Sequence, residues 1–402
     1  MKNGWQTKTL GDVAEISAGN SAPQDESLFK DGTYPFFRTA DAGRIRFGDI
    51  CESTDYLNEK GIQGLRRYPK GTILFPKSGA STFLNHRVML GVEGCVSSHL
   101  ATIVADETQI KPRFLLYFLS TVAAQDLVQD HAYPSLNLPT IAGISIQAPP
   151  LPEQQRIIDI LDEVFESIAT AKANAEKNLQ NASALFESYL QSVFAQRGPG
   201  WVEKPFSDLC DIKHGFAFKS EFFASEGDYV LLTPGNFYES GGYRDRAEKQ
   251  KYYTGEIPRD YVLSEGDLLV AMTEQAAGLL GSPILIPESD KFLHNQRLGL
   301  VTKKSGIPWT NEFFFHVFNT QTVRREIHDS ASGVKVRHTS PTKIGEVVVA
   351  FPTSLHEQGI IVSTLADLNE ETKRLSSLHA RKLAALEALK KSLLHQAFSG
   401  KL

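Results

Sequence analysis

Two stretches of the chain, LPEQQRIIDILDEVF at residues 151–165 and LHEQGIIVSTLADLN at residues 355–369, repeat each other about two hundred residues apart. Each opens a long amphipathic stretch, and the two align without gaps from Leu151 and Leu355 as far as Phe194 and Phe398. Chance similarity between two helices rarely keeps its register for so long. The repeat therefore predicts a chain built from two copies of one unit.

The residues that precede each stretch are also duplicated. The segment from Trp5 to Gly19 has the same spacing of apolar, Gly and Asp residues as the segment from Trp201 to Gly215. Short apolar runs bounded by Gly and Pro follow in the same order in both halves, which is typical of strands. Two further apolar runs, residues 114–119 and 313–318, are expected to be buried helices.

These patterns predict an α+β protein in which two mixed α/β domains stand in tandem and each is followed by a long helix. The breaks at Pro149-Pro150, Gly198-Pro199-Gly200 and Pro352 suggest the boundaries. We expect a first domain at 1–150, a central helix at 151–197, a second domain at 198–352 and a C-terminal helix at 353–402.

The two long helices carry a heptad pattern, with apolar residues at alternating spacings of four and three and one interruption in the first helix. The expected seams comprise Ile157, Leu161, Val164, Ile168, Ala171, Ala175, Leu179, Ala182, Phe186, Tyr189 and Val193, and Leu368, Thr372, Leu375, His379, Lys382, Leu386, Leu389 and Leu393. We expect the helices to form an antiparallel coiled coil with approximate twofold symmetry. Two independent helical hairpins are the alternative.

Composition bounds the class of protein. The chain has 402 residues and a net charge of -5, so any binding to DNA must rest on local positive patches. Its three cysteines lack CxxC spacing, no run approaches eighteen apolar residues, and the N-terminus lacks the apolar core of a signal peptide. We expect a cytoplasmic protein.

Catalytic signatures are missing from the sequence. It contains no GxxxxGK[ST] phosphate loop, no GxGxxG after a strand, no HExxH and no Asn-Pro-Pro-aromatic motif of the adenine methyltransferases. Its histidines have no repeated spacing that metal ligands would require. We therefore expect no catalytic residues and no metal site, and a role in recognition and scaffolding.

The chain resembles the specificity subunit of Type I restriction-modification enzymes over essentially its full length. The resemblance is carried by Pro-Leu-Pro-Glu-Gln-Gln-Arg-Ile-Ile from Pro150, its echo at Leu355, the closing Leu-His-Gln-Ala-Phe-Ser-Gly-Lys-Leu from Leu394, and the tandem layout. It implies two target recognition domains, each reading one half of a bipartite, asymmetric site in double-stranded DNA. The helices would set the spacing and dock two modification subunits.

The resemblance also implies the chemistry of the complex. The modification subunits would bring S-adenosylmethionine for adenine methylation, and restriction subunits would add ATP, Mg and DNA cleavage, while this chain would bind no cofactor. Two alternatives remain: the specificity subunit of a Type II system with a fused methylase-nuclease, and a coiled-coil adaptor that does not bind DNA.

Candidate DNA contacts are the basic and amide residues in loops that differ between the halves, because Lys and Arg bind phosphates while Arg, Asn and Gln read bases. In the first domain they are Arg38, Thr39, Arg44, Arg46, Arg66, Arg67, Lys77, Ser78, Tyr133, Ser135 and Asn137. In the second they are Asn236, Thr273, Gln275, Lys335, Arg337 and His338. Arg87 and Arg297 are weaker candidates because apolar neighbours suggest that they lie in strands.

The matched helix positions are the candidates for partner docking, because two equivalent partners need two equivalent surfaces. These positions are Glu153, Gln154, Ile157, Leu161, Glu357, Gln358, Ile361, Leu365 and Phe398.

Overall fold

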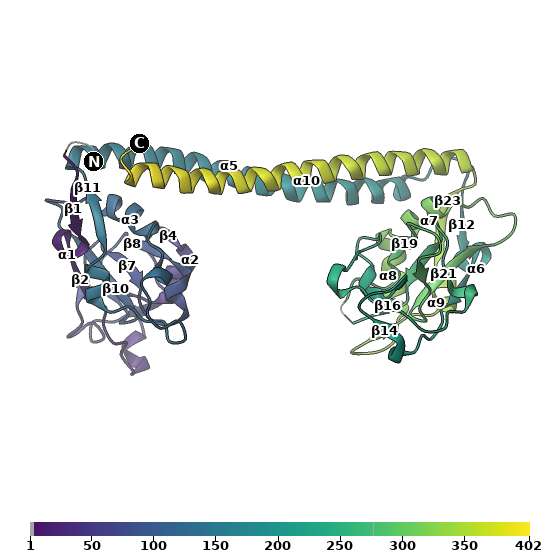
Figure 1. Ribbon diagram of the computed structural model, residues 1–402, viewed down its shortest axis with the longest axis horizontal. Coiled ribbons are helices and arrows are strands. Elements are labelled where there is room, and N and C mark those ends of the chain that lie inside the picture. Colours follow the sequence, from purple (N-terminus) through teal and green to yellow (C-terminus); the bar gives the residue numbers. More distant parts are fainter. Residues whose placement is uncertain (1–3, 276) are drawn as a thin grey trace. The chain divides into compact units, whose positions relative to one another are not determined.

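The computed structural model describes residues 4–275 and 277–402, which form two compact units. Unit 1 consists of Met1–Glu176 and Arg381–Leu402, and unit 2 consists of Lys177–Ala380. Each unit therefore contains one mixed α/β domain together with part of both long helices, α5 (Leu151–Gln196) and α10 (Leu355–Phe398) (Figure 1). Both helices begin at the residues where the sequence repeat begins.

The described residues of unit 1 form three sheets. The main sheet has the order β2-β10-β7-β8-β4, a second sheet the order β5-β3-β9-β6, and β1 pairs with β11. Their bounds are β1 Gln6–Thr9, β2 Ala14–Ala18, β3 Tyr34–Phe37, β4 Phe47–Ile50, β5 Asp55–Leu57, β6 Arg67–Tyr68, β7 Ile73–Pro76, β8 Arg87–Leu90, β9 Gly94–Val96, β10 Leu100–Ala105 and β11 Ser145–Ala148. The helices of the domain are α1 Leu10–Val13, α2 Thr39–Ile45, α3 Pro112–Ser120 and α4 Leu138–Ala142.

Unit 2 repeats this plan. Its sheets have the orders β13-β21-β17-β19 and β14-β16-β15-β20, with two further pairs, β12-β23 and β18-β22. Their bounds are β12 Trp201–Pro205, β13 Cys210–His214, β14 Phe223–Ala224, β15 Tyr229–Leu231, β16 Tyr252–Tyr253, β17 Leu268–Ala271, β18 Thr273–Glu274, β19 Pro283–Leu285, β20 Phe292–Leu293, β21 Leu298–Lys303, β22 Arg337–His338 and β23 Val348–Pro352. The helices are α6 Phe206–Leu209, α7 Asn311–Phe318, α8 Gln321–Ser330 and α9 Pro341–Gly345.

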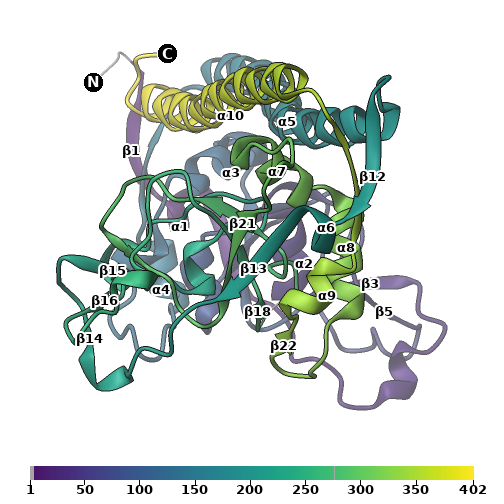
Figure 2. The ribbon, with the colours of Figure 1, turned by 90° about the vertical axis from the view of Figure 1, so that its right-hand side faces the viewer.

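The correspondence extends to pairing and close packing. In both main sheets the second strand in the order, β10 or β21, pairs antiparallel with two neighbours, as Figure 2 shows for β13 and β21. A Cβ added at Gly19 would lie 2.3 Å from the carbonyl oxygen of Ser97, and one added at Gly215 would lie 2.3 Å from that of Asn295. Only glycine fits at either point, which explains why the two glycines recur at the same place in the repeat.

The predicted apolar helices lie at the centre of each unit. The side chains of Phe114, Leu115, Leu116 and Leu119 on α3 are fully buried, as are Phe313, Phe314 and Phe318 on α7. In unit 1, Phe398 near the end of α10 packs against Phe114 and Phe118. In unit 2, Phe194 near the end of α5 packs in the same way against Phe313 and Trp201.

Within unit 1 the two long helices run antiparallel. Arg156 on α5 donates to the carbonyl oxygen of Leu402, and Lys172 on α5 forms an ion pair with Glu387 on α10. A later residue of α5 therefore contacts an earlier residue of the C-terminal segment 381–402, as antiparallel packing requires. In unit 2, Phe194 near the end of α5 and Ile361 near the start of α10 pack against the same apolar core.

The heptad prediction holds over most of α5, where Ile157, Leu161, Ile168, Ala175 and Ala182 are buried. The seam then shifts by one position, because Leu190 is fully buried and the predicted Tyr189 is 37% exposed.

In α10, the predicted seam residue Thr372 is buried and donates its hydroxyl to the carbonyl oxygen of Asn369. The prediction is wrong for Lys382 and Leu389, which are exposed, while their neighbours Leu383 and Lys390 lie partly buried. The buried seam shifts by one residue because a straight helix gradually rotates away from a strict seven-residue repeat.

Within residues 4–275 and 277–402, no helix combines the length and the apolar character that crossing a bilayer requires.

Candidate nucleic-acid interface

Two groups of predicted contact residues meet at one edge of unit 1. Ser78, just after β7, pairs as an isolated bridge with Ser135. The amide of Gly79 donates to the carbonyl oxygen of Pro134 over 2.8 Å, and the amide of Leu136 donates to that of Lys77 over 2.8 Å. The loop at 77–79 and the loop at 133–137, more than fifty residues apart in sequence, therefore form one surface.

Unit 2 has the same junction with different side chains. Thr273 and Glu274, just after β17, pair with His338 and Arg337 in the β18-β22 ladder. This ladder stands where the Ser78–Ser135 bridge stands in unit 1, since β7 and β17 are the equivalent strands next to β10 and β21. We refer to these two places as the paired loops.

The paired loops expose chemically different groups. In unit 1, the Tyr133 side chain is 82% exposed, Ser135 is exposed, and Lys77 is partly buried. In unit 2 the exposed groups are Gln275, Lys335 and His338. Among the residues that the structure describes, neither Lys77 nor Lys335 has an ion-pair partner.

Two predicted residues of the paired loops have structural roles. Asn137 accepts hydrogen bonds from the amide and hydroxyl of Thr140, both over 2.7 Å, and so caps the N-terminus of α4. Arg337 donates to the carbonyl oxygen of His328 over 2.6 Å and to its ring. Ser340 caps α9 at the position equivalent to Asn137, and Arg337 holds the loop in place. In Asn137 and Arg337, only the N–H groups that do not take part in these hydrogen bonds are available to a ligand.

Four predicted arginines of unit 1 are already paired with carboxylates of the same unit. Arg38 pairs with Asp55 and also lies over the rings of Phe29 and Phe36. The other three pairs are Arg44 with Asp41 at 2.8 Å, Arg66 with Glu15 at 2.7 Å and Arg67 with Glu93 at 3.1 Å. Arg66 lowers the pKa of Glu15 through its hydrogen bond. We call Arg38, Arg44, Arg66 and Arg67 the paired arginines, because part of the charge and of the donor capacity of each is already used by a carboxylate.

Thr39 and Arg46 lie at the two ends of α2. Thr39 is its first residue and is partly buried, whereas Arg46 ends the helix with φ at 66° and an exposed side chain. Arg46 has no ion-pair partner among the described residues and borders a groove next to α10.

The prediction for Asn236 is wrong. Its side chain is 1% exposed, and its oxygen accepts from the amide and hydroxyl of Thr233, both over 3.0 Å. Its amide nitrogen donates to Gln250 over 2.9 Å and to the carbonyl oxygen of Arg244 over 3.3 Å. Both polar atoms of its side chain are bonded inside unit 2, so Asn236 holds the loop and its side chain is not exposed to a ligand.

Unit 2 also has a concave site that the sequence prediction missed. The hollow holds about 860 Å³ and is bordered by Arg244, Arg246, Lys251 and Arg297, together with Tyr238 and Glu239. The guanidinium of Arg244 lies 5.8 Å from the ring centroid of Tyr238, whose side chain is 50% exposed. The site adjoins the paired loops through Thr273 and Gln275. We call this the basic pocket.

The cations of the basic pocket are available to a ligand. In the described part of the chain, none of its three arginines forms an ion pair, and Arg297 is exposed although the sequence suggested a strand. Arg246 lies across Gly235, where an added Cβ would be 2.9 Å from its Nη1. The signal in the sequence was the run Arg-Asp-Arg-Ala-Glu-Lys-Gln-Lys from Arg244, inside the region that differs between the halves.

The walls of the basic pocket are held by a buried carboxylate, Glu274, and a partly buried guanidinium, Arg324. Glu274 accepts backbone hydrogen bonds from Gly278, Leu279 and Leu280 at 2.8–3.1 Å. Arg324 donates to the carbonyl oxygens of Leu280 and Glu239, and burial lowers its pKa to about 10. These bonds tie together the two loops on either side of the pocket, so the pocket is formed before any ligand binds.

Five predicted docking residues are inside their own units. Gln154, Ile157, Leu161, Gln358 and Leu365 are at most 1% exposed, which corrects the prediction that they face a partner. The repeated apolar pattern therefore indicated a face of each long helix that is buried, and this face packs against other residues of the same chain.

The other four docking candidates are only partly accessible. Glu153 forms an ion pair with Arg156, and Glu357 accepts a hydrogen bond from the Trp201 indole over 2.8 Å. Ile361 packs on the core of unit 2, and Phe398 packs on α3.

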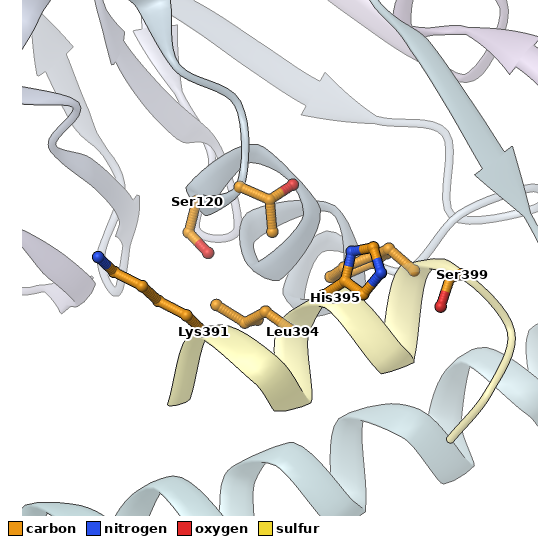
Figure 3. A pocket seen from close by; sticks show the side chains of 7 residues that line it. Ser120, Lys391, Leu394, His395 and Ser399 are labelled. Carbon is orange, nitrogen blue, oxygen red and sulfur yellow. The ribbon is translucent and has the colours of Figure 1, made fainter. Parts of the chain in front are cut away.

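An accessible groove lies between the last turns of α10 and the end of α3, and the predicted docking residue Phe398 is among the residues that line it. It holds about 540 Å³, and Figure 3 shows Lys391, His395 and Ser399 along one side with Ser120, the last residue of α3, facing them across Leu394. A second hollow, bordered by Arg46, Lys390 and one carboxylate, Glu387, shares Ser120, Lys391 and Leu394 with it. Together they form a cationic groove within unit 1.

Comparison with known proteins agrees with this architecture. The family model described as "Type I restriction modification DNA specificity domain" matches residues 2–180 and again 199–388. The specificity subunit of the Type I restriction enzyme MjaIX of Methanocaldococcus jannaschii is 28% identical over 172 residues, which cover 42% of this chain and 39% of that protein. The EcoBI specificity subunit of Escherichia coli is 25% identical over 236 residues, 58% of this chain. The match spans 44% of that relative, so the chain aligns with less than half the length of either.

Solved structures share the fold. A chain from a structure concerned with complex assembly and conformational transition of the type I R-M system superposes with a TM-score of 0.76 at 18% identity, covering 100% of this chain and 99% of that one. The HsdS subunit from Thermoanaerobacter tengcongensis gives a TM-score of 0.63 at 18% identity, covering 100% and 98%. The two matched domains, the tandem α+β architecture and the curated relatives together show that the chain belongs to the Type I restriction-modification specificity family.

Proposed function

We propose that this chain is the DNA-recognition component of a Type I restriction-modification complex, and that each unit reads one half of a bipartite site. The observation that carries the proposal is that equivalent paired loops, on one shared framework, expose different side chains in the two units. A constant scaffold with unlike reading groups is what an asymmetric split site requires.

The exposed groups have the chemistry of DNA recognition. Lys77, Lys335 and the arginines of the basic pocket suit phosphates, while an arginine can also bind guanine through two hydrogen bonds. Gln275 suits adenine in the same manner, and Tyr133 offers a hydroxyl and a flat apolar face. The basic pocket adjoins the unit 2 loops, so phosphate and base contacts could form on one continuous surface.

This chain would recognise the DNA site, and its partner subunits would carry out methylation and cleavage. Two modification subunits would bring S-adenosylmethionine for adenine methylation, and restriction subunits would bring ATP and Mg for cleavage. The cationic groove beside α10, which the predicted docking residue Phe398 helps to line, is the accessible surface that suits one such partner, since five of the other predicted docking positions are buried. With a net charge of -5, we expect the isolated chain to bind DNA weakly, and nanomolar site-specific binding by it alone would contradict this.

Deletion of the gene in its host, followed by long-read sequencing that detects methylated adenine, tests the proposal. We expect a split sequence motif that is methylated in the parent strain and unmethylated in the deletion strain. An unchanged methylation pattern, in a host whose modification gene is expressed, would overturn the proposed function.

A further inference from the structure

One buried glutamine lies at the root of each long helix. Gln154 is the fourth residue of α5 and Gln358 the fourth of α10, and both side chains are 0% exposed. A buried amide is costly unless its polar atoms are hydrogen-bonded, so the partners of these two side chains indicate what they do.

Gln154 joins three segments of unit 1. Its Oε1 accepts from the amide of Lys111 over 2.8 Å, and its Nε2 donates to the carbonyl oxygens of Gln109 over 3.0 Å and Pro149 over 2.8 Å. Lys111 is the N-cap residue of α3, and Pro149 follows β11. One side chain thus connects the helix root to the central helix of the domain and to its last strand.

Gln358 makes the same connections in unit 2. Its Oε1 accepts from the amide and hydroxyl of Thr310, both over 3.1 Å, and its Nε2 donates to the carbonyl oxygens of Pro308 over 2.8 Å and Pro352 over 3.0 Å. Thr310 is the N-cap residue of α7, and Pro352 ends β23. The two glutamines therefore hold equivalent sets of backbone groups.

The hydrogen bonds of Gln154 and Gln358 depend on direction, whereas apolar contacts at the same place would not. An aliphatic residue could fill the volume, but it would leave a partly buried amide, a partly buried carbonyl group and a buried carbonyl group without these partners. Each glutamine therefore favours one orientation of the helix root relative to α3 or α7, where packing alone would tolerate a range of angles.

We propose that Gln154 and Gln358 are positioning residues that hold each α/β domain at one angle to the root of its long helix, and that this angle determines how strictly the complex discriminates between spacings of its two half-sites. The second part rests on the proposed function. The first part is a property of each unit by itself.

Spin labels within unit 1 test the angle without DNA. Lys60 in the domain and Asn174 on α5 are both exposed, and Lys60→Cys with Asn174→Cys can be labelled in a Cys51→Ser background because Cys95 is buried in unit 1 and Cys210 in unit 2. We expect one narrow distance distribution between the labels by double electron–electron resonance, and a broadened or displaced one with Gln154→Met. The matched control is Gln155→Met, because Gln155 is exposed and donates to Asp159 on its own helix.

The second measurement uses the complete complex with its modification subunits. Methylation is measured on duplexes in which the native spacing of the half-sites is lengthened or shortened by one base pair. For Gln154→Met and Gln358→Met we expect preference for the native spacing to fall about tenfold, while preference for the correct bases in each half-site is unchanged.

The two measurements separate the possible failures. A distance distribution that Gln154→Met leaves unchanged would overturn the positioning role, whatever the DNA result. Broadened distances with unchanged spacing preference would overturn its link to spacing. A complex that prefers no sequence would refute the proposed function, and the labels would still decide the first part. If Gln154→Met does not fold, Lys111→Pro leaves Gln154 in place and removes only the amide that donates to its Oε1, at a residue whose φ of -77° suits proline.

Discussion

The positive side chains of unit 1 and unit 2 are used differently. In unit 1 the paired arginines are bonded to carboxylates of the same unit, whereas the arginines of the basic pocket in unit 2 have no such partner in the described part of the chain. The framework beneath them is the same, down to the glycines at 19 and 215 and the glutamines at 154 and 358. The difference teaches that duplication has kept the scaffold and changed the surfaces, which suits two readers of unlike half-sites.

The largest expected effect tests whether the framework is shared. Leu190 in unit 2 and Leu394 in unit 1 occupy equivalent positions of the repeat and are 0% and 8% exposed. We expect Leu190→Ala and Leu394→Ala each to lower the free energy of unfolding of its own unit by about 2–5 kcal/mol, as measured by hydrogen exchange in each unit.

Leu185 and Leu389 are the matched controls, since they are also equivalent to each other but are 50% and 45% exposed. Substituting either with alanine should cost less than about 1 kcal/mol. A large loss of unfolding free energy on substituting one buried leucine and a negligible loss on substituting its equivalent would show that the cores of the two units are stabilised differently.

The next effect concerns acid, and we expect it in unit 2. Burial lowers the pKa of His294 from 6.5 to about 4. The unfolded chain takes up this proton first, so the stabilising contribution is complete above pH 6.5 and is lost as the pH falls toward 4. The loss approaches about 3 kcal/mol, and it can be followed by tryptophan fluorescence in a Trp5→Phe background, where all remaining tryptophans belong to unit 2.

Unit 1 supplies the control for this prediction. Val96, next to Ser97, stands where His294 stands next to Asn295, since their carbonyls approach Gly19 and Gly215 in the same way. Burial also lowers the pKa of His316 in unit 2 to about 4, so we expect His294→Val to reduce the pH dependence of unit 2 between pH 6.5 and 4 by about half. A dependence of undiminished size in this variant would assign the acid sensitivity to groups other than His294.

The sequence predicted those features that depend on local pattern. The starts of α5 and α10, the buried helices α3 and α7 and the start of the heptad seam all follow from spacing of apolar residues and from Pro and Gly. It could not predict that Arg66 meets Glu15 or that Arg38 meets Asp55, because these partners are brought together only by the folded chain. Asn236 was misjudged for the same reason, since its partner Gln250 lies fourteen residues away on a folded loop.

The third prediction contrasts the basic pocket with unit 1. We expect the double variant Arg244→Ala with Arg246→Ala to weaken binding of the assembled complex to its site about hundredfold, because each lost contact to a base or phosphate costs about 1–3 kcal/mol. Binding is measured by fluorescence anisotropy at several salt concentrations. The dependence on salt should become shallower if phosphate contacts are among those lost.

The smallest effect is expected from the paired arginines. Arg66→Ala with Arg67→Ala removes two exposed ion pairs, each worth about 0–1 kcal/mol, and the partner carboxylates remain in solvent. We expect DNA affinity of the complex to change less than about fivefold in the same anisotropy assay. A loss as large as that of the Arg244 and Arg246 variant would mean that these arginines leave their carboxylates to bind DNA.

The most direct test of the two-reader account is selection of bound duplexes, by the assembled complex, from a library in which both half-sites are randomised. We expect the wild-type chain to select two different half-sites at one spacing. The Arg244→Ala and Arg246→Ala variant should relax the bases in one half only and leave the other half as strictly selected as before. Equal relaxation of both halves, or selection of a single continuous site, would contradict the account.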